Sequence, residues 1–348
     1  MKDRQNILFL INPKSGVIGK KNLPGLIEGN IDRGRFDYKI EFTQFAGHAC
    51  ELAAAAADRG VDVVVAVGGD GTVNEVARSL VHTKTALGVL PCGSGNGFAR
   101  HLGVPLDLKK ALEFLNKAEP VEIDYGKLNG KPFFCACGLG FDALVSADFA
   151  NGYNRGLLGY VHKTLVDWVT YEPEVYELEA DSGKKSYKAF LIACGNASQY
   201  GNNAYITPFA SMRDGMLSVS ILEPFTPFEV PVVVRQLFSN KLNENSHMTT
   251  FTTRRMVVKR ESPGPVHYDG EPYMMDRELV VEVVPCGLKV MASPGWDGTC
   301  TPVPLYRQIR EIMEGAVAEL PAFPSFPIKR RGFEKDLQQL PLLHYIFK

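Results

Sequence analysis

Three glycine-rich loops carry the residues best suited to chemistry. Each follows an apolar run that predicts a buried strand, and the loops are NPKSG (12–16), GGDGT (68–72) and GSGNG (93–97). Glycine lets the main chain approach a phosphate closely, and exposed amides in such loops donate hydrogen bonds. In a doubly wound sheet these loops gather at the carboxyl ends of the strands, where ligands bind. The pattern predicts a phosphate site, although any one loop alone could be a simple tight turn.

Two common phosphate motifs are missing from these loops. None of the loops continues into the Gly-Lys-Ser/Thr of a Walker A loop, and GGDGTVN lacks the third glycine of the dinucleotide fingerprint. The loops therefore do not form a Walker A site, and a dinucleotide redox fold is disfavoured.

Asp70 stands among the glycines of the second loop, where its carboxylate would repel a bare phosphate. A Mg²⁺ ion that bridges the phosphates would remove this repulsion, as in other phosphoryl transfers. The carboxylate could also handle a proton during the reaction. The structural alternative is an Asx-type cap for the helix that follows the loop.

The composition of the 348-residue chain limits what kind of protein it can be. Hydrophobic residues make up 45% and the net charge is -1, which predicts two globular domains without a basic field for nucleic acid. The seven cysteines are scattered, as is typical of reduced thiols in a cytoplasmic protein. The apolar run at 7–11 is too short for a signal peptide, and no run reaches the roughly 20 apolar residues of a membrane span. If the protein contacts a membrane, it is expected to bind at the membrane surface.

The N-terminal part alternates predicted strands and helices. Strands are expected at residues 7–11, 38–42, 61–67 and 86–90, and helices at 48–58, 72–80 and 108–116. This order predicts a doubly wound α/β domain over residues 1–124, with a parallel sheet covered on both faces.

The character of the sequence changes near Asp124. Short alternating segments separated by turns predict an antiparallel β-sandwich or open barrel over residues 125–297, with one helix at about 157–169. The tail, 298–348, contains a predicted amphipathic helix at 305–320 and an end that mixes basic and apolar residues. The tail would pack on the body, pair with a second copy in a homodimer, or touch anionic lipid.

Five segments in order resemble the diacylglycerol kinase catalytic family, which includes bacterial soluble lipid kinases, sphingosine kinases and ceramide kinases. They are NPKSG, VVAVGGDGTVNEV, LGVLPCGSGNGFAR, IDYGKLNGKPFFCACGLGFDA and VHYDGEPY, and the match covers about residues 5–295. The resemblance is specific. GGDGT also occurs in NAD kinases and phosphofructokinases, but the later GSGN and DGE elements do not accompany it there in this arrangement.

The resemblance implies a set of ATP-binding residues and a water-mediated magnesium contact. Asp124, at the domain junction, resembles an acidic residue of the family's magnesium–water network. The residues implied to contact ATP are Asn12, Ser15, Gly16, Thr43, His48, Gly69, Asp70, Gly71, Thr72, Gly93, Ser94, Asn96 and Glu271.

The catalytic candidates that the resemblance supplies are Asp70, Asp269 and Glu271, of which the last two belong to the YDGE segment of the second domain. In bacterial diacylglycerol kinases the aspartate of this segment is taken as the general base, whereas in sphingosine kinases the aspartate matching Asp70 has that role. The sequence leaves the choice open. A hairpin turn is the structural alternative for YDGE, because Asp-Gly favours such turns.

Two features bear on the lipid. Bacterial diacylglycerol kinases usually read GT-x-ND-F where this chain reads GSGNGF (93–98), so an aspartate is missing at Gly97 and the loop is closer to that of sphingosine and ceramide kinases. Asp148 and Arg155 resemble, at the same mutual spacing, an acid and a base that line the sphingosine-kinase substrate site. A carboxylate would suit a sphingoid ammonium, and a solvated helix end is the alternative.

The sequence thus predicts an ATP- and Mg²⁺-dependent lipid kinase. It would phosphorylate a primary hydroxyl of a sphingoid base, a diacylglycerol or a similar lipid, presented at a membrane surface, in the cleft between the two domains. A kinase of a soluble acceptor such as NAD is one alternative. A non-catalytic, nucleotide-dependent lipid-binding protein is another.

Overall fold

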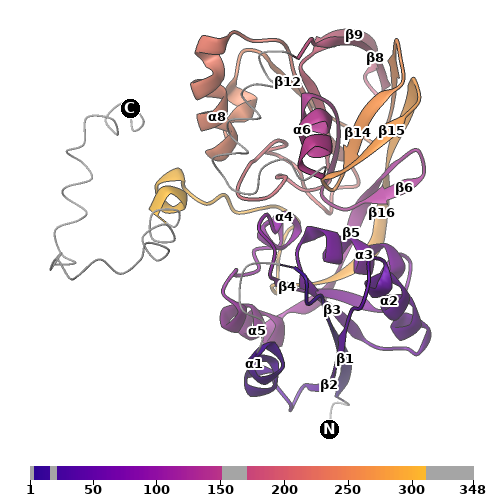
Figure 1. Cartoon of the computed structure of the whole chain (residues 1–348), viewed down its shortest axis with the longest axis vertical. Helices are drawn as coiled ribbons and strands as arrows, with labels where there is room; N and C mark the ends of the chain where they lie inside the picture. Colours follow the sequence, from indigo (N-terminus) through magenta and orange to yellow (C-terminus); the bar gives the residue numbers. More distant parts are fainter. Residues whose placement is uncertain (1–3, 16–21, 151–170, 311–348) are drawn as a thin grey trace, which may run out of the picture. The chain divides into compact units, whose positions relative to one another are not determined.

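The computed structural model describes residues 4–15, 22–150 and 171–310, apart from the side chains of 148–150 (Figure 1). The chain divides into two compact units, Met1–Val303 and Pro304–Lys348, and the first unit holds both sheets. In the second unit residues 305–310 are helical. The rest of the helix predicted there lies outside the described residues.

Four parallel strands form the centre of the N-terminal part. They are β1 (Gln5–Ile11), β2 (Phe36–Phe42), β3 (Val63–Gly68) and β4 (Ala86–Pro91), in the order β2-β1-β3-β4. β3 and β4 are buried along their whole length, because a parallel sheet is covered on both faces and selects continuous apolar runs. The predicted doubly wound α/β domain is confirmed.

Helices link these strands, and three of them match the prediction to within two residues at each end. The helices are α1 (Leu23–Asn30), α2 (His48–Asp58), α3 (Asp70–Leu80), α4 (Gly97–His101) and α5 (Leu108–Lys117). The sequence gives little sign of α1, because LPGLIEGN contains a proline and two glycines, or of α4, because five residues show no periodicity.

Two long strands run from the N-terminal part into the C-terminal part. They are β5 (Glu119–Leu128) and β16 (Glu278–Ala292), which pair antiparallel with each other. β16 also pairs parallel with β4, where Val290 faces Leu87. One sheet of ten strands therefore continues through both parts, and Asp124, the last residue of the predicted first domain, lies inside β5.

The C-terminal part completes this sheet and adds a second one. The ten-stranded sheet gains β6 (Lys131–Phe133), β8 (Glu174–Ala180), β9 (Gly183–Ala189) and β13 (Arg255–Arg260). The six-stranded sheet contains β7 (Ala136–Gly140), β10 (Leu191–Gly195), β11 (Leu217–Leu222), β12 (Met248–Thr253), β14 (Gly264–Tyr268) and β15 (Glu271–Met275). Its order is β12-β11-β10-β7-β14-β15, and all its pairs are antiparallel.

An apolar core joins the two sheets, with Leu139 and Ile192 from one and Met256 and Val281 from the other. The predicted antiparallel sandwich is therefore confirmed. Helix α6 (Phe141–Ala150) lies against β14 and β15. Helix α8 (Val230–Phe238) contacts the short 3₁₀ turn Leu242–Glu244, which in turn contacts β12 (Figure 1). The helix predicted at 157–169 lies outside the described residues. No helix in the described part of the chain is long and apolar enough to cross a bilayer.

Candidate functional site

The four parallel strands bring their following loops to one edge of the sheet. Asn12 follows β1, Thr43 follows β2, Gly69 follows β3, and the loop of Gly93 follows β4. The chain leaves β1 toward β2 on one side and returns to β3 on the other. This arrangement makes a topological switch point between β1 and β3, which is where open α/β sheets bind ligands.

The three loops touch one another directly. Asn12 Nδ2 donates to Thr72 Oγ1 over 3.0 Å, which ties the first loop to the second. Within the first loop, Ser15 Oγ donates to Asn12 O over 3.1 Å. The second and third loops meet backbone to backbone, because a Cβ on Gly93 would lie 2.5 Å from Gly69 Cα. Glycine at these two positions is what permits the approach.

Asn96 shapes the third loop from within. Its backbone is left-handed, with φ 51°, a conformation that Asn tolerates better than most residues. Its Oδ1 accepts from Gly93 N over 2.9 Å, and its Nδ2 donates to Gly93 O over 2.7 Å. Asn96 is buried, whereas Ser94 and Gly71 are exposed at the loop tips. Ser94 is therefore better placed than Asn96 to meet a ligand with its side chain.

Asp70 is the first residue of α3, and its carboxylate faces the third loop. The N-cap position of α3 is Gly69 and not Asp70, so the Asx-cap alternative is wrong. Instead, Phe98 N donates to Asp70 Oδ1 over 3.3 Å. Burial raises the pKa of Asp70 from 3.8 to about 6; the Phe98 hydrogen bond opposes this rise, and the charge of Asp269 adds to it.

Asp269 differs from Asp70 because both of its oxygens are fully engaged. Oδ1 accepts from Cys135 N over 2.7 Å and from Ala136 N over 3.2 Å. Oδ2 accepts from Phe134 N over 2.8 Å and from Asn74 Nδ2 over 2.7 Å. Burial raises the pKa of Asp269, and these bonds oppose the rise. Asn74 lies on α3 one turn after Asp70, so the carboxylate from the C-terminal part is bonded to the helix that begins with Asp70.

The YDGE segment is a hairpin, as its structural alternative predicts. Asp269 and Gly270 form the two-residue turn between β14 and β15, with φ of 48° and 81°. The turn still directs Asp269 into the site. Glu271 is exposed, and it accepts a hydrogen bond from Tyr273 Oη over 2.9 Å. The described contacts do not join Glu271 to Asp70.

Asp124 is buried and held by the main chain. Its Oδ1 accepts from Cys286 N over 2.8 Å, and its Oδ2 accepts from Gly215 N over 2.7 Å. Its backbone oxygen accepts from Asn196 Nδ2, which also binds Phe134 O. Asp124 is thus linked through Asn196 to the segment whose amides hold Asp269.

The remaining predicted residues fall into two groups. Thr43 is buried and its amide donates to Ile11 O over 2.9 Å, while His48 Nδ1 accepts from Gln44 N over 3.1 Å at the start of α2. Both belong to the edge that carries the loops. The second group cannot be placed: Gly16 and Arg155 lie outside the described residues, and Asp148 is in α6 but its side chain is outside them.

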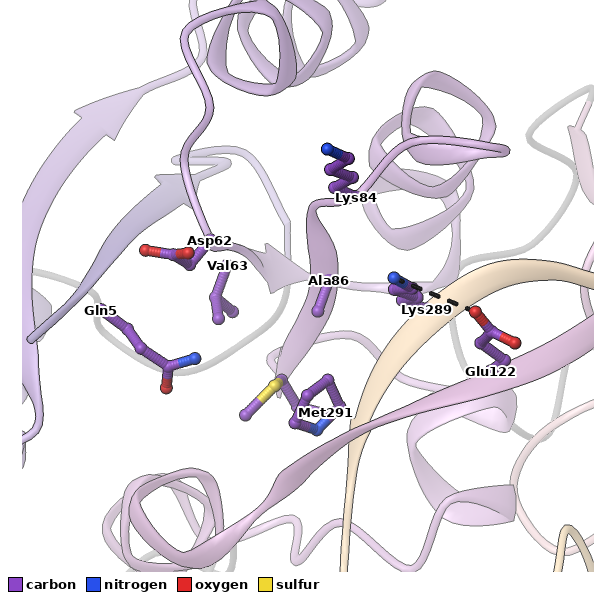
Figure 2. Close-up of a pocket in the computed structure, with 9 residues that line it drawn as sticks. Gln5, Asp62, Val63, Lys84, Ala86, Glu122, Lys289 and Met291 are labelled. Atoms are coloured by element: carbon purple, nitrogen blue, oxygen red, sulfur yellow. Dashed lines mark ion pairs between the residues drawn. The ribbon is translucent and has the colours of Figure 1, made fainter. Parts of the chain in front are cut away.

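A separate cavity of about 340 Å³ lies at the opposite end of the parallel strands (Figure 2). Gln5 and Ala86, at the amino ends of β1 and β4, line it. Glu122 and Lys289 pair at its rim with an N–O distance of 3.9 Å. Ligands of open α/β sheets bind at the carboxyl ends, so this cavity is distinct from the candidate site.

The structure adds residues that the sequence alone does not single out. Asn74 is four residues after Asp70, so helical spacing could have placed both on one face of α3. Tyr200 and Gly201 lie in a loop of the C-terminal part that packs on the third glycine loop. No sequence signal points to that contact, because it joins segments about a hundred residues apart.

Comparison with known proteins decides the family. A model of the diacylglycerol kinase catalytic domain matches residues 6–128, and a model of the YegS C-terminal NAD kinase beta sandwich-like domain matches residues 136–292. A protein of Chromohalobacter salexigens named "Probable lipid kinase YegS-like" is 30% identical over 275 residues, which cover 76% of this chain and 86% of that protein. The chain belongs to the diacylglycerol kinase catalytic-domain family.

A second relative and a solved structure are also similar to this chain. A Klebsiella pneumoniae protein, also named "Probable lipid kinase YegS-like", is 30% identical over 296 residues, which cover 82% of this chain and 96% of that protein. A solved structure described as a diacylglycerol kinase from Bacillus anthracis str. Sterne superposes with a TM-score of 0.65 at 21% identity, covering 84% of this chain and 98% of that one. At this identity the superposition shows the shared fold.

Proposed function

We propose that this chain is an ATP-dependent lipid kinase that transfers the γ-phosphate to a primary hydroxyl of a sphingoid base or a diacylglycerol-type lipid. Family membership and the names of its relatives support a lipid kinase. The two-part architecture supports a cleft, because the loops at the switch point belong to the N-terminal part and Asp269 comes from the C-terminal part. ATP would lie on the first part and the lipid against the second.

The observation that carries the proposal is the difference between Asp70 and Asp269. Asp269 accepts four hydrogen bonds, which use the two acceptor sites of each oxygen, so it would have to lose a bond to take a proton. Asp70 accepts a long bond of 3.3 Å from Phe98 N, and the amides of Asn96 and Gly97 also stabilise its charged form. Its pKa is still raised to about 6, which suits a proton acceptor near neutral pH. We therefore assign the proton of the lipid hydroxyl to Asp70, as the hydroxyl oxygen attacks the γ-phosphorus and ADP leaves.

The phosphates of ATP would be bound by main-chain amides of the three loops and by their exposed hydroxyls. Amides at glycine loops are donors without a competing side chain, and α3 adds the positive end of an eleven-residue helix. Outside the loops we propose that Thr43 and His48 contact the nucleotide, and that the exposed Glu271 reaches it from the second part. Within the loops the proposed ATP contacts are Asn12, Ser15, Gly16, Gly69, Gly71, Thr72, Gly93, Ser94 and Asn96.

The residues present fit a hydrated Mg²⁺ ion better than a protein cage. No group of three His, Cys, Asp or Glu side chains poised to hold a metal occurs among the described residues. Mg²⁺ usually keeps several waters and binds one or two carboxylates plus substrate phosphates. Asp70 has unused acceptor sites, and Asp124, beside the buried and unpartnered Asn196 Oδ1, could hold a metal-bound water. When bound, the ion would neutralise phosphate charge.

The acceptor would be a lipid taken from a membrane surface by a cytoplasmic enzyme. We propose that Asp148 and Arg155 contact the lipid headgroup, because they resemble an acid and a base of the sphingosine-kinase substrate site. A carboxylate there would favour a sphingoid ammonium over a neutral diacylglycerol. Comparing charged and neutral acceptors therefore tests this part of the proposal.

The experiment is transfer of radiolabelled phosphate from ATP to a panel of acceptors: sphinganine, ceramide, diacylglycerol, monoacylglycerol, phosphatidylglycerol and NAD. The proposal expects labelled product from at least one lipid with a free primary hydroxyl, and a far lower rate with NAD. Transfer to NAD alone would establish the soluble-acceptor alternative. ATP binding by calorimetry without transfer to any acceptor would establish a non-catalytic nucleotide-binding protein. Either result overturns the proposal.

A further inference from the structure

The third glycine loop is clamped by a loop of the C-terminal part. Asn202 N donates to Gly95 O over 3.0 Å, and a Cβ on Gly201 would lie 3.0 Å from Gly95 Cα. A Cβ on Gly97 would lie 2.9 Å from Tyr200 O and 3.1 Å from Gly201 N. The backbone of 200–202 therefore fixes the loop that faces Asp70.

The side chain of Tyr200 is anchored in a buried polar cluster. Its hydroxyl donates to Asp142 Oδ2 over 2.6 Å, and His267 Nε2 lies 3.1 Å from the same oxygen. Ala143 N donates to Asp142 Oδ1 over 2.8 Å. Asp142 and His267 are 9% and 2% exposed, so these bonds replace almost all hydration of the carboxylate. Burial, with the charge of Asp142, raises the pKa of Tyr200 well above its usual range, which keeps its hydroxyl protonated as a donor.

This polar cluster costs folding free energy, which argues that it does more than fill the core. Because the carboxylate accepts, His267 Nε2 carries the proton, and its Nδ1 is left buried without a partner among the described residues. A buried unsatisfied atom costs about 1–3 kcal/mol. Gly138, opposite His267 in the β7–β14 pair, must be glycine, because a Cβ there would overlap Asp142 Oδ2 and His267 Nε2.

The cluster ends next to Asp269. His267 is on β14 two residues before Asp269, and the β7–β14 pairing extends to a bond from Asp269 N to Ala136 O of 2.8 Å. Phe134 and Cys135, whose amides bind the Asp269 carboxylate, directly precede β7 in the chain. A fixed His267 ring thus fixes the start of the hairpin turn.

We propose that Tyr200, Asp142 and His267 are positioning residues that hold the third glycine loop and the Asp269 hairpin in one fixed arrangement. On the nucleotide side, the backbone at Tyr200 packs against Gly97 and so holds the third glycine loop in place. On the acceptor side, His267 holds the strand that leads into Asp269. This inference rests on the proposed function for its consequence in catalysis, but its structural content does not.

Hydrogen exchange tests the structural content without any activity. Tyr200→Phe removes one hydroxyl and keeps the ring on His267, whose centroid is 5.5 Å away. The expected result is exchange at Phe134 and Cys135 that is faster by about tenfold or more, because Asp269 is no longer held. The matched control is Tyr205→Phe, which removes a buried hydroxyl of the same loop. That hydroxyl accepts from Val303 N and donates to Asn203 Oδ1 over 3.4 Å, and it makes no described bond to Asp142 or His267. Unchanged exchange in Tyr200→Phe, or an equal rise in Tyr205→Phe, overturns the proposal.

Kinetics test the consequence. Measured per folded molecule, Tyr200→Phe should lower kcat about tenfold while the KM for ATP and for lipid changes less than about threefold. A double-mutant cycle with His267→Gln should be non-additive, because both variants break one unit, whereas Tyr200→Phe with Tyr205→Phe should be additive. Additivity of Tyr200→Phe with His267→Gln, or full kcat in Tyr200→Phe, contradicts the positioning role. If wild type phosphorylates no lipid, the proposed function fails, and the exchange result still decides the positioning role.

Discussion

Asn74 Nδ2 donates to Asp269 Oδ2 over 2.7 Å, and this bond joins the helix that begins with Asp70 to the hairpin of the C-terminal part. It is one of four bonds to Asp269 and the only one of them that comes from the N-terminal part. The two carboxylates of the site therefore share a scaffold, and Asp269 is the more tightly held of the two.

Asn74→Ala should weaken both the fold and the reaction. It removes one hydrogen bond to a buried carboxylate, so the free energy of unfolding should fall by about 2 kcal/mol, and kcat should fall because Asp269 is less well fixed. Denaturant unfolding and initial rates measure the two effects. The control is Asn116→Ala, which removes the bond from Asn116 Nδ2 to Asn30 O and the bond from Asp32 N to Asn116 Oδ1, far from the loops. It should lower stability and leave kcat unchanged; equal kcat values in the two variants would refute the role of Asn74.

Gly97→Asp, which restores the residue usual in bacterial diacylglycerol kinases, should be harmful here. A Cβ would lie 2.9 Å from Tyr200 O, so any side chain at 97 pushes the third loop away from the C-terminal part. Gly97→Ala separates size from charge, and both variants should lower Tm and kcat. Gly29→Ala, in α1 with open space around it, should raise Tm slightly. A Gly97→Asp variant with wild-type Tm and kcat would show that the contact is not limiting.

The pH dependence of the reaction should report Asp70. A proton acceptor works only when ionised, so kcat/KM for the lipid should fall about tenfold per pH unit below about pH 6, because the pKa of Asp70 is raised to about 6. Rates from pH 5 to 8, corrected for folded fraction, measure this limb. A limb that begins near pH 4, the ordinary range of an aspartate, would mean that the catalytic base is a different group or is not buried.

His101 should make the fold sensitive to acid. Its ring is fully buried. Nε2 donates to Gly298 O over 3.0 Å and Nδ1 accepts from Ser198 N over 3.0 Å, so the hydrogen bonds of the fold require the neutral imidazole. Burial lowers the pKa of His101 from 6.5 to about 4. The unfolded chain binds this proton first, so stability is full above about pH 6.5 and falls by about 3 kcal/mol as pH drops to about 4.

The measurement for His101 is Tm against pH, compared with His101→Gln. The variant should be less stable at pH 7.5, because it loses part of the buried hydrogen bonding, and its Tm should fall less steeply between about pH 6.5 and 4. Parallel curves for wild type and variant would mean that other groups cause the acid sensitivity.

The sequence predicts the N-terminal sheet well, because buried parallel strands are continuous apolar runs and each ends in a glycine loop. Asn12, Gly69 and Gly93 lie together at the carboxyl ends of the strands because of that topology. Local pattern could not show that β16 returns to pair with β4, since this pairing joins residues about two hundred positions apart. The number of C-terminal strands was also less clear, because β14 and β15 are short and contain glycine or proline.

Within the site, residue type was easier to predict than role. Asp70 and Asp269 are both aspartates next to glycine, and no sequence rule separates them. The difference arises from three-dimensional contacts. Amides of Phe134, Cys135 and Ala136 bond Asp269 at 2.7–3.2 Å, whereas the bond from Phe98 N to Asp70 is longer, at 3.3 Å. In the same way, Gly97 departs from the aspartate that is usual at this position in bacterial diacylglycerol kinases. The structure explains the glycine, because the backbone of Tyr200 leaves no room for a side chain there.

The most direct test of the central assignment is the kcat of Asp70→Asn for phosphate transfer from ATP to the best lipid of the panel. Asparagine keeps the shape of the side chain and cannot accept the proton, so kcat should fall by about 10²–10⁴-fold while Tm stays close to wild type and ATP still binds. Asp70→Asn protein that is folded, binds ATP and transfers phosphate at the wild-type rate would contradict the account.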